Sequence, residues 1–182
     1  AESGEAIVAA RASALEALAA AQEDAETAFP TADLMIAHPD VALPDKADGL
    51  VEIWADTRGR DLAAGRTLVG PHRIDMEGTY RAKALAARNA STGEQKALLV
   101  SLILANARAL AADIGAPPLL LLDEVAAHLD KDRQAALYDE ICALGAQAWM
   151  TGTGAELFQA LGQRAQYFEV FDHGGQSEVR PL

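Results

Sequence analysis

The feature that most constrains this chain is a run of four leucines, residues 119–122, which follows two prolines and ends in the acidic pair Asp123 and Glu124. A short unbroken apolar run between turn residues is typical of a central strand in a parallel sheet. The two acids would then lie at the carboxyl edge of the sheet, where open α/β sheets bind their ligands. One carboxylate there can hold Mg²⁺ while its neighbour orients a water molecule. A strand that merely ends in a charged turn would give the same pattern.

A second polar segment opens a long apolar stretch. Its residues are Ser91, Thr92, Gly93, Glu94, Gln95 and Lys96. Ser91 with Glu94 three positions later matches a capping box, which predicts the start of a helix. A capped helix start with a glycine and a hydroxyl is also suited to bind an anion. The two interpretations are compatible, because the same N–H groups serve both.

A third segment, residues 127–130, follows the acidic pair and ends in Asp130. By itself it predicts only a turn, with Asp130 capping the next helix. His128 within it is expected to be a surface or packed histidine rather than a metal ligand.

The remaining patterns predict an α/β architecture in which helices and strands alternate. Helices are expected at 5–28, 50–64, 97–111, 132–144 and 156–161, strands at 67–69, 74–80, 119–122, 146–150 and 167–171, a loop at 37–49 and a hairpin turn at Gly174 and Gly175. Helix 97–111 is apolar almost all round and should be buried. We expect a helical arm subdomain at residues 1–65 and an α/β part at residues 66–182.

Composition places the chain in a reducing, aqueous setting. Cys142 is the only cysteine, which excludes a disulfide framework and suits the cytosol. The N-terminal residues carry no secretion signal, and the longest apolar run, 97–105, is about half of what a membrane span needs. The sequence therefore predicts a soluble, cytoplasmic protein with no membrane partner.

Net charge is −12, which disfavours nucleic acid on average, yet residues 58–96 hold eight basic residues against four acidic ones. This stretch is either a solvated surface of mixed charge or a locally basic surface that contacts DNA. The basic residues expected to reach the surface are Arg58, Arg60, Arg81, Lys83 and Arg88.

Taken together, the order and spacing of the three segments resemble an ABC-type (P-loop NTPase) ATPase head. Residues 91–95 match the signature motif, Asp123 and Glu124 the Walker B pair, and residues 127–130 the D-loop. Within that superfamily, residues 91–96, the string 70–73 with Asp75, and residues 151–153 resemble the RecF family of DNA recombination and repair proteins.

The resemblance implies a C-terminal part of such a head, preceded by a helical subdomain. It implies ATP, Mg²⁺, an ATP-dependent homodimer, DNA, and RecR and RecA as partners, with roles in replication, repair and the SOS response. In the implied dimer, Asp123 holds Mg²⁺ through a water and Glu124 positions the hydrolytic water. Ser91 and the Gly93 N–H, within the signature formed with Thr92, Glu94 and Gln95, bind the partner's γ-phosphate. Asp130 would lie at the dimer seam, and Thr151 or Thr153 replaces the switch histidine of transporter ATPases.

The sequence contains no phosphate-binding loop of the form G-x-x-x-x-G-K-[ST]. The nearest string, residues 59–67, has one residue too many between its glycines, has arginine in place of lysine, and follows a helix. Both ATP and Mg²⁺ are therefore expected to need an upstream half, and the chain alone is expected to be inactive. Two alternatives remain: a non-enzymatic DNA- or protein-binding module, and a nucleotide-binding subunit of a transporter.

Overall fold

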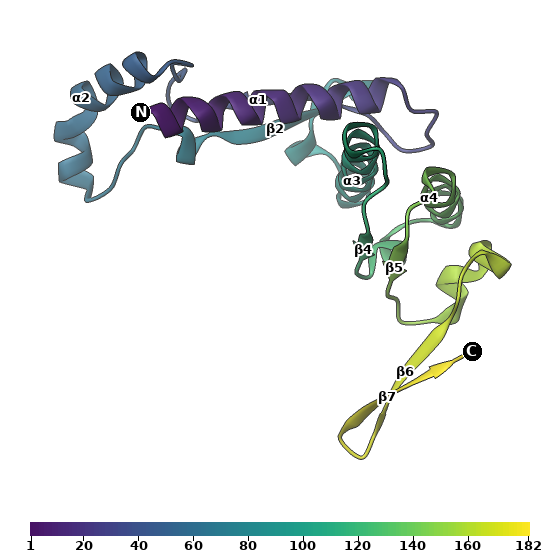
Figure 1. Ribbon diagram of the computed structural model, residues 1–182. Helices are drawn as coiled ribbons and strands as arrows, with labels where there is room; N and C mark the ends of the chain where they lie inside the picture. The colour runs from purple at the N-terminus through teal and green to yellow at the C-terminus, as the bar shows by residue number, and fades with distance from the viewer. The chain divides into compact units, whose positions relative to one another are not determined.

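A computed structural model describes residues 1–182, apart from the side chain of His173. The chain divides into two compact units, residues 1–116 and residues 117–182, and each is described by itself (Figure 1).

The first unit combines three long helices with a small antiparallel sheet. Its helices and strands are α1 (Glu2–Glu23), β1 (Ala32–Ala37), α2 (Ala47–Ala64), β2 (Asp75–Tyr80), β3 (Leu85–Ala86) and α3 (Thr92–Ile114). The strands are ordered β1-β2-β3, and β1 pairs with β2 from Ala32 opposite Tyr80 to Ala37 opposite Asp75. Helix α1 contacts α2, α3 and β1, and it runs along β2 in Figure 1.

Small side chains let these helices approach closely. Gly4 of α1 faces α2, where an added Cβ would lie 2.9 Å from Leu50 Cδ1. On α3, the buried side is largely alanine and leucine, including Ala97, Leu104 and Ala105. The prediction that this helix is buried all round is wrong for Leu99, which is 59% exposed.

Helix α3 is also long and apolar enough to cross a membrane by length and composition, with 39% of the relevant window buried. A core helix of a soluble protein meets the same criterion. Its contact with α1, within the first unit, covers part of its apolar surface.

The second unit is built on two parallel strands. Strand β4 (Leu120–Leu122) pairs with β5 (Ala148–Met150), and α4 (Lys131–Leu144) connects them. A 3₁₀ segment (Ala155–Arg164) and an antiparallel hairpin, β6 (Phe168–His173) with β7 (Gln176–Pro181), follow. The core contains Leu120, Leu122, Leu137, Tyr138 and Ile141, and the Tyr138 hydroxyl donates to the Leu157 carbonyl at 2.7 Å. Leu121, on the other side of β4, is 73% exposed.

Most predicted elements are confirmed, with two errors in the first unit. Strand β1 was not expected, and residues 67–69 do not form the predicted strand. Their backbone groups bond to side chains instead: the Val69 carbonyl accepts from Trp54 Nε1 at 2.8 Å, and the Leu68 N–H donates to Asp61 Oδ1 at 3.0 Å. Glycines end α2 and α4, since Gly65 and Gly145 adopt left-handed conformations.

The expected subdomain boundary between residues 65 and 66 remains a prediction about domain organisation. In this chain β1, from the first segment, pairs with β2 from the second. The sheet therefore joins the two segments within one compact unit.

Gln22 fastens the end of α1 to the start of β1, and it is 2% exposed. Its amide accepts from the Ala32 N–H at 2.9 Å and donates to the Ala32 carbonyl at 3.2 Å. We expect Gln22→Ala to lower the free energy of unfolding by about 2 kcal/mol or more, because two backbone groups lose their partners. Urea denaturation of the chain measures this. The control is Glu16→Ala on an exposed position of the same helix, and equal values for the two variants would contradict the prediction.

Candidate functional site

The start of α3 is fixed by a reciprocal capping box around Ser91. The Ser91 Oγ accepts from the Glu94 N–H at 3.4 Å, and Glu94 Oε2 accepts from the Ser91 N–H at 2.9 Å. The Ser91 hydroxyl also donates to Glu94 Oε2 at 2.8 Å. The predicted capping box is confirmed, and it commits the Ser91 hydroxyl to its own helix.

Glu94 has a further partner that the sequence did not reveal. Lys83, from the 3₁₀ turn after β2, forms an ion pair with the Glu94 carboxylate. The hydrogen bonds from Lys83 and then from Ser91 lower the pKa of Glu94 to about 2. The same contact raises the pKa of Lys83. Glu94 is thus a structural carboxylate that holds the helix start against the preceding turn.

Gln95 is directed backward as well. Its Nε2 donates to the carbonyls of Ala87, Arg88 and Ala90 at 3.1–3.2 Å. Thr92 and Gly93, in contrast, are exposed, and a Cβ added at Gly93 would meet nothing. Their N–H groups lie in the first helical turn, where no intrahelical carbonyl is available to accept from them. The open part of the signature segment is therefore its backbone at residues 92 and 93.

The acidic edge of β4 forms a second cluster, in the second unit. Because β4 and β5 are parallel and in register, their carboxyl ends meet, and the Thr151 N–H donates to the Leu122 carbonyl at 3.1 Å. The Thr151 hydroxyl donates to Asp123 Oδ1 and accepts from the Glu124 N–H at 3.0 Å. The structure thus brings together three of the predicted site residues.

Glu124 occupies a left-handed backbone conformation with φ of 52°. Such a conformation is costly for a residue other than glycine and is often found at functional sites. The side chains of Asp123 and Glu124 are exposed. Both acids thus follow the buried side chains of Leu120 and Leu122 and still reach solvent.

The donor set at this edge is suited to only part of a magnesium site. No group of three or more His, Cys, Asp or Glu residues in the described part of the chain could hold a metal ion. Mg²⁺ bound with a nucleotide typically takes one or two carboxylates, waters and phosphate oxygens. Exposed Asp123, oriented by the Thr151 hydroxyl, fits the protein's share of such a site.

The loop after the acids is held by local hydrogen bonds. Asp130 caps α4 by accepting from the Arg133 N–H at 2.9 Å, and it pairs with the Arg133 guanidinium at 3.5 Å. Gln134 donates to the carbonyls of Ala126 and Leu129 at 2.9 and 3.1 Å. The predicted capping role of Asp130 is confirmed, and Gln134 is a positioning residue that sequence reasoning missed.

Thr153 does not join the acidic cluster. It is exposed, and no hydrogen bond connects it to Asp123 or Glu124 among the described residues. Gly152 precedes it where an added Cβ would lie 2.8 Å from Leu157 Cδ1 and 2.9 Å from Phe158 Cζ. Of the two threonines, Thr151 is the one placed to act on the acids.

A capped helix start with an exposed backbone, and acids at the carboxyl edge of a parallel strand pair, are parts of an ABC-type ATPase head. No family model matches the chain. Curated sequences named DNA replication and repair protein RecF do match: 52% identity over 163 residues in Allorhizobium ampelinum and 49% over 179 residues in Brucella abortus. These alignments cover 87% and 93% of this chain but 43% and 46% of the relatives.

Solved structures show the same fold. A structure of the recombination mediator protein RecF with ATP matches all of this chain and 48% of its own, with a TM-score of 0.69 and 23% identity. Over most of its own length the chain is therefore similar to RecF proteins. It spans less than half the length of the curated relatives that it matches, as expected for a C-terminal part.

The lowered pKa of Glu94 gives a prediction about acid stability. Because the folded value is about 2 and the ordinary value is 4.5, the ionised carboxylate stabilises the fold above about pH 4.5. This contribution is lost as the pH falls toward 2. We expect Glu94→Gln to lower the melting temperature at pH 7, and the difference from the unsubstituted chain to shrink as the pH falls from 4.5 to 3. Thermal melts across this range test it, with exposed Glu52→Gln as the control; a difference that did not vary with pH would contradict it.

Proposed function

We propose that this chain is the C-terminal part of an ATPase of DNA recombination and repair, which binds ATP between two copies and acts on DNA. The observation that carries the proposal is the cluster of Asp123, Glu124 and Thr151 at the carboxyl edge of β4. The printed names of the relatives, DNA replication and repair protein RecF, support the biological setting. A RecF structure that holds ATP supports the nucleotide.

In this proposal the acidic cluster performs the chemistry on the chain's own nucleotide. Asp123 would hold Mg²⁺ through a water, and the metal would supply positive charge to the phosphates. Glu124 accepts a hydrogen bond from the attacking water and orients it toward the γ-phosphate. The Thr151 hydroxyl fixes the rotamer of Asp123 and the backbone of Glu124, which supports a positioning role for it.

The signature segment serves the nucleotide of the other copy. The exposed N–H groups of Thr92 and Gly93 and the positive end of the α3 dipole suit a γ-phosphate. Glu94 and Gln95 hold this turn in place and do not contact the phosphate. The Ser91 hydroxyl would add a contact only by exchanging its bond to Glu94. Asp130 would lie at the dimer seam, and Thr153 remains the alternative to Thr151 at the position of the switch histidine.

The rest of the proposed biology concerns the complete protein. It would work in the cytoplasm on DNA at gaps, with RecR and RecA as partners. The chain alone would not hydrolyse ATP, since its sequence holds no phosphate-binding loop.

Glu124→Gln tests the catalytic assignment in the complete protein that carries this chain. We expect ATP binding to persist and turnover to fall by about 100-fold or more, because the amide cannot act as a base toward water. Steady-state phosphate release and nucleotide titration measure the two effects. Asp132→Asn removes one charge from the first turn of α4 and is the control. Unchanged turnover in Glu124→Gln would remove Glu124 from the reaction.

Gly93→Asp tests the role of the signature turn without disturbing the cap. A Cβ added at Gly93 has no neighbour within 4 Å, and an acid in the first turn of a helix favours its dipole. Its charge should repel the partner's γ-phosphate and abolish the ATP-dependent dimer, leaving ATP binding to each subunit intact. Sedimentation of the complete protein with ATP gives the answer. Gly59→Asp, on an equally open position of α2, should dimerise normally, and a normal dimer of Gly93→Asp would refute the role.

A further inference from the structure

The structure separates the basic residues of the 58–96 stretch into paired and unpaired groups. Arg81 is exposed, as expected, and it pairs with Glu23 and Asp33. Lys83 and Arg88 are also engaged, by Glu94 and by Glu77. These contacts largely neutralise three of the five cations that the sequence favoured.

Arg66 and Arg73 belong to the other group. Among the described residues neither has a carboxylate partner, and Arg73 Nε is buried with no hydrogen-bond partner. Arg66, Thr67, His72 and Arg73 line one open cavity of about 550 Å³. A buried guanidinium N–H without an acceptor is costly, which favours a ligand that supplies one.

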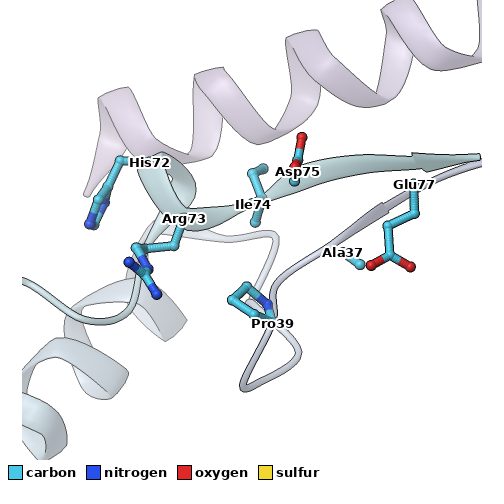
Figure 2. A pocket seen from close by; sticks show the side chains of 7 residues that line it. All are labelled: Ala37, Pro39, His72, Arg73, Ile74, Asp75 and Glu77. Carbon is cyan, nitrogen blue, oxygen red and sulfur yellow. The ribbon is translucent and has the colours of Figure 1, made fainter. Parts of the chain in front are cut away.

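A second cavity of about 420 Å³ shares His72 and Arg73 and extends toward Ala37 and Pro39 (Figure 2). Two carboxylates, those of Asp75 and Glu77, also line this second cavity. Figure 2 shows the Asp75 carboxylate on the opposite side of the strand from the Arg73 guanidinium. Glu77 lies farther along β2 and pairs with Arg88. The cationic part of this region is therefore the cavity on the Arg66 side.

The loop that carries these residues is held from several directions. The His72 Nε2 donates to the Thr67 carbonyl at 3.0 Å, a bond that requires its hydrogen on this nitrogen. Arg11 of α1 donates to the Pro71 carbonyl at 2.6 Å. Gly70 has a φ of 154°, and an added Cβ would lie 3.0 Å from His72 Nδ1. These contacts fix the backbone of the loop that carries Arg66 and Arg73.

We propose that Arg66, Thr67, His72 and Arg73 form a phosphate-binding site. Two arginine forks and a hydroxyl match the several oxygens of a phosphate, and guanidinium groups bind phosphate bidentately. No carboxylate is among the residues that line this cavity, and the Asp61 carboxylate nearby accepts from the Leu68 N–H.

The phosphate comes from the backbone of DNA. The cavity is open, which suits a chain that passes across it. None of the residues that line it belongs to the signature segment 91–95, which the proposal assigns to the partner's ATP. This assignment of the source rests on the proposed function, but the phosphate chemistry does not.

The first experiment measures DNA affinity of the complete protein against salt, with a labelled duplex and fluorescence anisotropy. Each phosphate contact that is lost should lower the salt slope by about one unit. We expect Arg66→Gln and Arg73→Gln each to lower it by about one, and the double variant by about two. Arg180→Gln removes the same charge from β7, where Arg180 already pairs with Glu178, and should leave the slope unchanged. Arg66 is exposed, so its substitution tests the site even if Arg73→Gln fails to fold.

The second experiment follows the Arg73 Nε–H resonance during titration with inorganic phosphate. A saturable shift that Arg66→Gln abolishes supports the site. If this shift occurs while the double variant keeps the full salt slope, the site takes a free phosphate compound and the DNA assignment is overturned. No shift together with an unchanged slope overturns the site itself. Failure of the unsubstituted protein to bind DNA at all would instead count against the proposed function.

Discussion

The parallel pairing of β4 with β5 is the interaction on which the candidate chemistry depends. It brings Thr151 to the residue that follows Leu122, so one hydroxyl can bond both to the Asp123 carboxylate and to the Glu124 N–H. Neither acid would be oriented by its own strand alone, because both side chains are exposed. The strand pair is in turn supported by α4, whose Leu137 and Ile141 are buried with Leu120 and Leu122. Packing on one side of the sheet thereby determines polar geometry at its edge.

The polar residues of the motifs divide into those that hold backbone and those that remain open. Glu94, Gln95 and Asp130 all use their side chains on groups of their own unit. These side chains cap helices and hold neighbouring backbone in place. The charge-assisted hydrogen bonds at Glu94 are strong enough to lower its pKa to about 2. What they leave accessible is the backbone of Thr92 and Gly93. Several positions of such a motif can therefore serve the structure while only a few contact a ligand.

Sequence reasoning succeeded where one local rule decided the outcome. The capping box at Ser91, the acids after the leucine run and the glycine ends of α2 and α4 each follow from a few adjacent residues. It failed where a distant partner decided. Strand β1 exists because β2, some 40 residues away, pairs with it, and Gln22 anchors its first residue. Residues 67–69 have strand-like composition, but Trp54 and Asp61 take their hydrogen bonds.

Charge shows the same limit. Counting residues 58–96 gives a basic stretch on an acidic chain, but the count does not say which cations remain available. The fold pairs Arg81, Lys83 and Arg88 with carboxylates that lie 11 to 58 positions away along the chain. Such exposed pairs add little stability individually, yet they remove cations from the surface that a polyanion would meet. Arg66 and Arg73, two of the cations for which the structure prints no such pair, are set in a loop whose backbone is held by Arg11 and His72. An electrostatic contact with DNA would depend on this local, unpaired positive charge and not on the net charge of −12.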